Sequence, residues 1–175
     1  MVPRTVLANN SNEGTIVAAA FDGKSLLVAG KTLSRNDSGG AMRTLPSPEG
    51  GTILALATHP DRLGRIIAAL VFGGVAISED GGQTWETRSK GLPDESVLAI
   101  TIAADLSDTF FAAVQGDGLW NSEDAGMSWK FVMDRPWLRE VERDPLALVS
   151  VDLETGMGGI WIYAGTEIGL TRVPD

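Results

Sequence analysis

Short apolar segments separated by turn residues recur along the whole chain. The longest, residues 66–77, is divided by a pair of glycines. A glycine pair between two apolar runs is typical of two β-strands joined by a tight turn, and the run is too short to span a membrane. Alanines alternate with other residues at Ala18 and Ala20 and again at Ala55 and Ala57. The pattern predicts an all-β chain whose strands carry a face of small side chains.

An octapeptide recurs in the middle of the chain. Ser78–Trp85 reads SEDGGQTW, and Ser122–Trp129 repeats it as SEDAGMSW. The apolar segments that precede each octapeptide repeat in the same register, so whole units recur. Units of roughly 40–45 residues with four short strands are typical of β-propeller blades. An earlier segment, Ser34–Ala41, is a decayed copy that lacks the tryptophan.

A fourth unit follows the second octapeptide, with strands expected at 147–151, 159–163 and 169–173. This unit lacks a fourth strand, whereas Arg4–Ala8 is a strand-like segment without a partner. We therefore expect Arg4–Ala8 to close the last blade, which would remove exposed sheet edges. The four blades would then occupy approximately 14–50, 51–93, 94–136 and 137–175.

The predicted fold is a single all-β domain, a small β-propeller of four blades with four antiparallel strands each. Small residues at Ala99, Thr101 and Ala103, like the alanines of the earlier units, favour inner strands that converge on a narrow axis. A half-ring remains the alternative. Two such chains would then exchange N-terminal strands and form an eight-bladed dimeric ring.

Composition narrows the possible partners and compartments. The 21 glycines agree with a turn-rich β protein, and the net charge of −9 disfavours nucleic acid and anionic membranes as partners. Without cysteine the chain has no disulfides or thiolate metal sites. We expect no cofactor and no membrane insertion. The N-terminus lacks a signal-peptide pattern, so a cytoplasmic protein is expected as the sequence stands, with an extracytoplasmic one left open.

The octapeptides have a local structural role in this interpretation. Asp followed by Gly favours a tight turn in which the carboxylate accepts backbone N–H groups, serine does the same, and tryptophan anchors the next strand. We predict that these residues are structural and that they neither bind a metal nor catalyse a reaction. They are Ser78, Asp80, Gly82, Trp85, Ser122, Asp124, Gly126 and Trp129.

The two octapeptides resemble the Asp-box (BNR) repeats of sialidases, sortilin-type receptors, reducing-end-specific xyloglucanases and photosystem II assembly factors. The resemblance implies a propeller but not a single function, because these relatives differ in activity. A sialidase would need a tyrosine nucleophile and an arginine triad. Here Tyr163 is the only tyrosine and lies in an apolar strand, while Arg65–Ile67 matches the expected arginine motif only faintly. The xyloglucanase type would need a second propeller, so we favour a protein without catalytic residues.

Three further residues are expected to be structural. His59, the only histidine, lies in a His-Pro-Asp turn and is interpreted as a capped loop residue. Trp120 and Trp161 fall at strand positions that we expect to pack between blades.

One loop suggests a binding role. The segment 133–145 is the longest predicted connection between blades and holds Trp137 among arginines. Aromatic and arginine side chains on loops of a rigid scaffold are common at interaction hot spots. The hypothesis is a protein-binding or assembly module, either monomer or homodimer, with carbohydrate binding or sialidase-related cleavage as the alternative. The candidate binding residues are Trp137, Arg135, Arg139, Arg143, Arg88 and Lys90.

Overall fold

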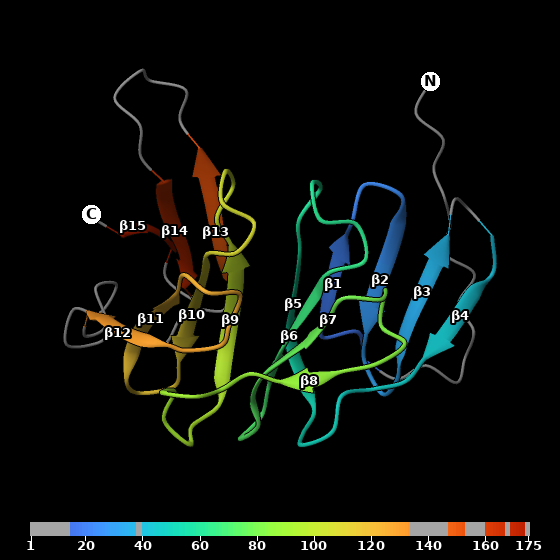
Figure 1. The fold of residues 1–175 in the computed structure, drawn as a ribbon, viewed down its shortest axis with the longest axis horizontal. Coiled ribbons are helices and arrows are strands. Elements are labelled where there is room, and N and C mark those ends of the chain that lie inside the picture. Colours follow the sequence, from blue (N-terminus) through green and yellow to red (C-terminus); the bar gives the residue numbers. More distant parts are fainter. Residues whose placement is uncertain (1–14, 38–39, 134–146, 153–159, 167–168, 174–175) are drawn as a thin grey trace.

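The computed structural model describes residues 15–37, 40–133, 147–152, 160–166 and 169–173. These residues form four antiparallel sheets, shown in Figure 1. Sheet 1 contains β1 (Ala18–Phe21), β2 (Ser25–Ala29), β3 (Leu33–Asp37) and β4 (Met42–Leu45). Sheet 2 contains β5 (Ile53–Thr58), β6 (Ile66–Leu70), β7 (Gly74–Ser78) and β8 (Glu86–Thr87). Sheet 3 contains β9 (Val97–Ile102), β10 (Phe110–Val114), β11 (Gly118–Ser122) and β12 (Lys130–Met133), and sheet 4 contains β13 (Ala147–Asp152), β14 (Ile160–Thr166) and β15 (Gly169–Val173).

Each sheet follows chain order from its first strand to its last, so the chain folds as a series of meanders. The first strands β1, β5, β9 and β13 pack side by side in that order. The sheets therefore radiate from a common inner line, which is the arrangement of propeller blades. The all-β propeller architecture expected from the repeats is confirmed.

The core consists of apolar layers between successive sheets. Ile67, Ala69 and Val75 of sheet 2 are buried against sheet 3, and Ile66 and Ala68 are buried against sheet 1. Because both faces of β6 and β7 are covered, every residue of these strands is buried. This two-sided burial explains the uninterrupted apolar run at this point of the sequence.

The four sheets form an arc with two open ends. In Figure 1, sheet 1 lies on the right, and sheets 3 and 4 lie on the left with sheet 4 above sheet 3. Neighbouring first strands pack from β1 to β13, but among the described residues β13 does not pack closely on β1. The alanines Ala18, Ala55 and Ala99 do line a common central space, as their spacing predicted. The expected closing strand, Arg4–Ala8, lies outside the described residues.

Candidate functional site

The first octapeptide forms the β7–β8 connection, and its own side chains hold it. The Ser78 hydroxyl accepts the Gly82 N–H at 2.8 Å and donates to Asp80 Oδ1 at 2.8 Å. Asp80 Oδ1 also accepts the Gln83 and Thr84 N–H groups, both at 2.9 Å, and Asp80 Oδ2 accepts the Thr84 hydroxyl at 2.6 Å. The carboxylate thus organises the turn.

The second octapeptide, between β11 and β12, repeats this network. Ser122 Oγ accepts the Gly126 N–H at 2.8 Å and donates to Asp124 Oδ1 at 2.8 Å. Asp124 accepts both the N–H of Ser128, at 2.9 Å, and its hydroxyl. The two networks differ at one bond, since the Met127 N–H donates to the Asp124 carbonyl whereas the Gln83 N–H donates to the Asp80 carboxylate. The remaining bonds recur, so the sequence repeat is largely a repeat of hydrogen bonds.

These hydrogen bonds change the acidity of both carboxyl groups. The Ser128 hydroxyl, with the Ser128 N–H and the Ser122 hydroxyl, lowers the pKa of Asp124 to about 2. The Thr84 hydroxyl and N–H and the Ser78 hydroxyl lower the pKa of Asp80 strongly. Both groups are therefore carboxylates at neutral pH, and neither is tuned to donate a proton in catalysis.

The octapeptide tryptophans join one sheet to the preceding sheet. The Trp85 indole N–H donates to the Pro46 carbonyl at the end of β4, at 3.0 Å. The Trp129 indole N–H donates to the Arg88 carbonyl just after β8, at 2.8 Å, and its buried ring packs with Phe110. The sequence indicated a local anchor for the next strand, but it did not reveal this bond across the sheet boundary.

Glycine is required inside both octapeptides. Gly126 has a φ of 84°, and an added Cβ would lie 2.7 Å from Ile77 Cδ1 of sheet 2. Gly82 has a φ of 89° and would bring a Cβ to 2.8 Å from Leu45 Cδ1 of sheet 1. The octapeptide therefore packs directly against the preceding sheet, and its positive φ at this position favours glycine.

Arg65 is the centre of an ion-pair cluster that connects sheets 2 and 3. Its buried guanidinium contacts Glu79 at 2.9 Å and Asp108 at 2.5 Å, donates to the Ser107 carbonyl and lies 5.8 Å from the Phe110 ring centre. Burial would lower the pKa of Arg65, but the hydrogen bonds to Glu79 and Asp108 outweigh it and raise this pKa. The Arg65 hydrogen bond in turn lowers the pKa of Asp108, partly offset by desolvation. Arg65 is occupied by the protein itself, unlike an arginine that grips a substrate carboxylate.

His59 is a buried loop residue that connects sheets 2 and 3. Its Nε2 lies 3.1 Å from the Ala104 carbonyl, and its Nδ1 accepts the Asp61 N–H at 3.2 Å. Nε2 therefore carries the proton, and both ring nitrogens have a protein partner. The capped-loop interpretation agrees with this geometry.

The two strand tryptophans have different surroundings. Trp120 packs against the cluster between sheets 2 and 3 and makes an edge contact with Phe131, with 5.6 Å between ring centres. Trp161 lies on the face of β14 that points away from sheet 3, and the Arg172 guanidinium covers it at 3.8 Å from the ring centre. Between-blade packing is thus seen for Trp120, whereas the contact given for the Trp161 ring is with Arg172 of its own sheet.

Two of the proposed binding residues lie in the connection between sheets 2 and 3. Arg88 donates to the Ala125 carbonyl at 2.8 Å and pairs with Glu86 at 2.8 Å, so its guanidinium is held by the protein. Lys90 is exposed, and its carbonyl accepts the Trp129 N–H. The four other proposed residues, Arg135, Trp137, Arg139 and Arg143, lie outside the described residues.

A cavity of about 220 Å³ lies where the first strands of the four sheets converge. Its lining consists of aliphatic residues and their backbone, including Val17, Leu54, Ile100 and Leu148. Among the described residues, no titratable side chain lines it. The sequence predicted small inner residues, but the volume depends on the arc that the sheets form.

Within the described ranges, no group of three or more acidic, histidine or cysteine side chains could hold a metal ion. The same part of the chain holds no helix with the length and apolarity that crossing a membrane requires.

Comparisons with known proteins identify the fold. No family model matches the chain, and no curated protein matches its sequence. Among solved structures, the chain is similar to the computationally designed Ika4 protein, with TM-score 0.64, 13% identity and coverage of 91% of this chain and 90% of that one. It is also similar to the WD40 β-propeller domain of Doa1, with TM-score 0.64 and 15% identity over 90% of this chain and 50% of that one.

A third similar structure is the GH74 enzyme of Niastella koreensis, with TM-score 0.63, 14% identity and coverage of 90% and 30%. The chain thus spans half of the WD40 chain and less than a third of the GH74 chain. These likenesses, at such low identities, show that the chain has the β-propeller fold.

Proposed function

We propose that this chain is a non-catalytic propeller of the Asp-box type that binds a protein partner or scaffolds an assembly. The observation that carries the proposal is how the polar residues singled out by the sequence are used. Asp80 and Asp124 hold turns, Arg65 is paired inside a sheet boundary, and both nitrogens of His59 are occupied. None of these groups faces the apolar central cavity.

The proposed binding surface is the set of connections that lead from one sheet to the next. Antiparallel topology places the connection that leaves a sheet at the opposite end from that sheet's own octapeptide, while Lys90 on the connection after sheet 2 bonds to Trp129 of the next octapeptide. Lys90 lies exposed on the connection from sheet 2 to sheet 3, and Trp137, Arg135, Arg139 and Arg143 belong to the next such connection along the chain. An aromatic and several arginines on neighbouring loops favour a partner with an acidic, partly apolar surface.

A capture experiment tests this surface. Tagged wild-type protein and the double variant Trp137→Ala/Arg139→Ala are incubated with extract of the native host, and captured proteins are identified by mass spectrometry. We expect a partner that wild type retains and the double variant loses, at unchanged melting temperature. Lys24→Ala, in the β1–β2 turn at the opposite end, is the matched control and should capture normally. Equal capture by the double variant would refute the site.

A carbohydrate role is the outcome that would replace this proposal. A glycan array and fluorogenic sialoside and glucoside substrates test it directly. We expect neither retention nor turnover. Turnover that disappears in Tyr163→Phe would establish an enzyme instead, because this variant removes only the phenol hydroxyl of the chain's single tyrosine.

A further inference from the structure

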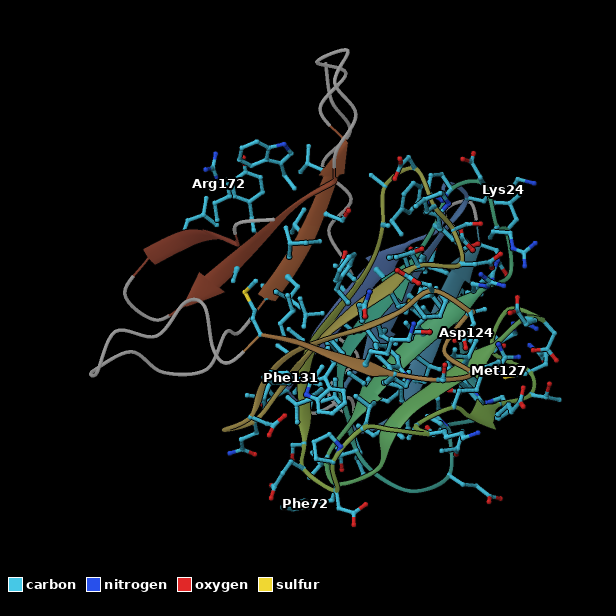
Figure 2. All side chains as sticks on the ribbon, turned by 60° about the vertical axis from the view of Figure 1, so that its left-hand side comes forward. Lys24, Phe72, Asp124, Met127, Phe131 and Arg172 are labelled. Carbon is cyan, nitrogen blue, oxygen red and sulfur yellow. The ribbon has the colours of Figure 1, made fainter. Side chains whose placement is uncertain are left out.

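The open end of sheet 4 carries an apolar face with the character of a blade interface. Leu148, Ile162 and Ala164 pack against sheet 3, so the alternate residues Val149 and Tyr163, which face each other across β13 and β14, point to the other side. On that side Val149 is 53% exposed and Leu170, opposite Gly165, is 73% exposed. Figure 2 shows Arg172 on this outer surface, away from the other sheets.

The open end of sheet 1 is apolar along its inner strand. Ala18 and Ala20 pack toward sheet 2, and the alternate residues Ala19 and Phe21 face outward. Ala19 is exposed, and Phe21 is 62% exposed. Further out on this face Val28 is already buried. The accessible part of this face is therefore β1. In a propeller, β1 would lie next to the first strand of the neighbouring blade.

Closure within one chain would require a further boundary between sheets 4 and 1, and among the described residues β13 does not pack closely on β1. Each boundary between adjacent sheets is a filled apolar layer, and polar bonds such as Trp129 to Arg88 and Arg65 to Asp108 also fix the sheet 2–3 boundary. Close-packed interfaces of this kind do not bend continuously. The chain also covers only half of the WD40 propeller chain that it resembles.

We propose that a second copy of this chain completes the ring. Sheet 4 of each copy packs on sheet 1 of the other, so two identical boundaries form around a two-fold axis and close an eight-bladed assembly. A second copy fits this position because the chain already packs one sheet on the next at the boundaries between sheets 1 and 2, 2 and 3, and 3 and 4. The outer faces of sheets 4 and 1 would form one more boundary of the same kind. Val149 and Leu170 of one copy then lie against the β1 side of the other, where Phe21 is exposed.

Solution mass tests the assembly. By light scattering, wild type should have twice the 18.5 kDa of one chain. The variant Val149→Lys/Leu170→Asp should have the mass of one chain with an unchanged β-sheet circular dichroism spectrum. Leu63→Asp, which changes a leucine that is 54% exposed on the β5–β6 loop, should remain at double mass. A wild-type monomer, or a dimer that survives the double variant, would overturn the proposal.

Cross-linking tests which faces meet. The chain has no cysteine, so Phe21→Cys and Val149→Cys each introduce a single thiol. Treated with a short bismaleimide, a mixture of the two variants should give a covalent dimer, whereas either variant alone should give little. A dimer from Val149→Cys alone would show sheet 4 facing sheet 4. A cross-link that forms only when both cysteines are in one chain, at monomer mass, would show closure within the chain; either result contradicts the proposal.

Discussion

Phe72 occupies a backbone conformation that favours glycine. It lies in the β6–β7 turn with a φ of 52°, and the corresponding turn of sheet 3 has Gly116 with a φ of 69°. The left-handed region costs a bulky residue about 1–2 kcal/mol. Because Phe72 is 70% exposed, its packing recovers little of this cost. The strain therefore lies in the turn itself.

Replacing Phe72 with glycine should stabilise the fold slightly. Relief of the left-handed strain exceeds the extra chain entropy of glycine, which leaves a net gain of about 0.5–1 kcal/mol. Urea unfolding, monitored by tryptophan fluorescence, measures this change in the free energy of unfolding. Phe72→Ala keeps the strain and is the control, for which no gain is expected. A loss of stability in Phe72→Gly would show that the aromatic ring has a packing partner.

The low pKa of Asp124 predicts a specific acid response. The folded pKa of about 2 lies below the ordinary value of 3.8, so the folded state holds fewer protons between these values. The stabilisation from this carboxylate is complete above about pH 4 and is lost as the pH falls through about 2. Carbon-detected NMR titration should place the Asp124 midpoint near 2.

Removal of the main hydrogen-bond donor should shift this midpoint. In Ser128→Ala the pKa of Asp124 should rise toward its ordinary value, because the hydrogen bond from the Ser128 hydroxyl is the largest cause of the lowered pKa. Thr84→Ala, which affects Asp80 in the same way, should leave Asp124 unchanged. An unchanged Asp124 titration in Ser128→Ala would contradict the geometry of the second octapeptide.

At the scale of elements, each octapeptide connects two sheets. The turn is held by its own side chains, while its glycine and tryptophan contact the sheet before it. Ser34–Ala41 of sheet 1 lacks the tryptophan, so this copy has no indole with which to make such a connection.

The two octapeptide tryptophans should differ in importance. Trp129 is buried, so Trp129→Ala removes both the bond to Arg88 and a filled apolar volume, at a cost of about 3–5 kcal/mol. Trp85 is only partly buried, and Trp85→Ala should cost less. Chemical denaturation of both variants measures the difference. Equal losses would mean that the hydrogen bond, and not the burial, dominates.

Much of the fold was predictable because the repeat recurs in register. Matching segments placed β6 and β10 as equivalent strands, and the predicted strands of the fourth unit correspond to β13, β14 and β15. The candidate site was less predictable. Two partners of Arg65, Ser107 and Asp108, come from the neighbouring sheet 3, and no spacing rule relates residues 65 and 108. The curvature of the arc also follows from side-chain volumes at the boundaries, which a periodic pattern does not encode.

At the scale of the whole molecule, stability is concentrated in the middle of the arc. Sheet 2 is covered on both faces, and β6 and β7 are buried throughout and hydrogen-bonded on both sides. The outer strand β8 has two exposed residues. Repeat architectures open most readily where neighbours are fewest.

Hydrogen exchange should follow this gradient. The amides of Ile67 and Ala68 should exchange only through global unfolding, whereas those of β8 and β12 should exchange through local opening. NMR-detected exchange in low urea distinguishes the two, because only global opening depends steeply on denaturant. Uniform protection across sheets 2 and 3 would contradict the gradient.

The tryptophan bonds also have a direction. Trp85 reaches back to sheet 1 and Trp129 reaches back to sheet 2, so each bond joins a later part of the chain to an earlier one. During synthesis the acceptor carbonyl has always left the ribosome before the indole that binds it. Each sheet can thus form its tryptophan hydrogen bond to the preceding sheet as soon as its own octapeptide leaves the ribosome. Folding can therefore proceed one sheet at a time from the N-terminal side.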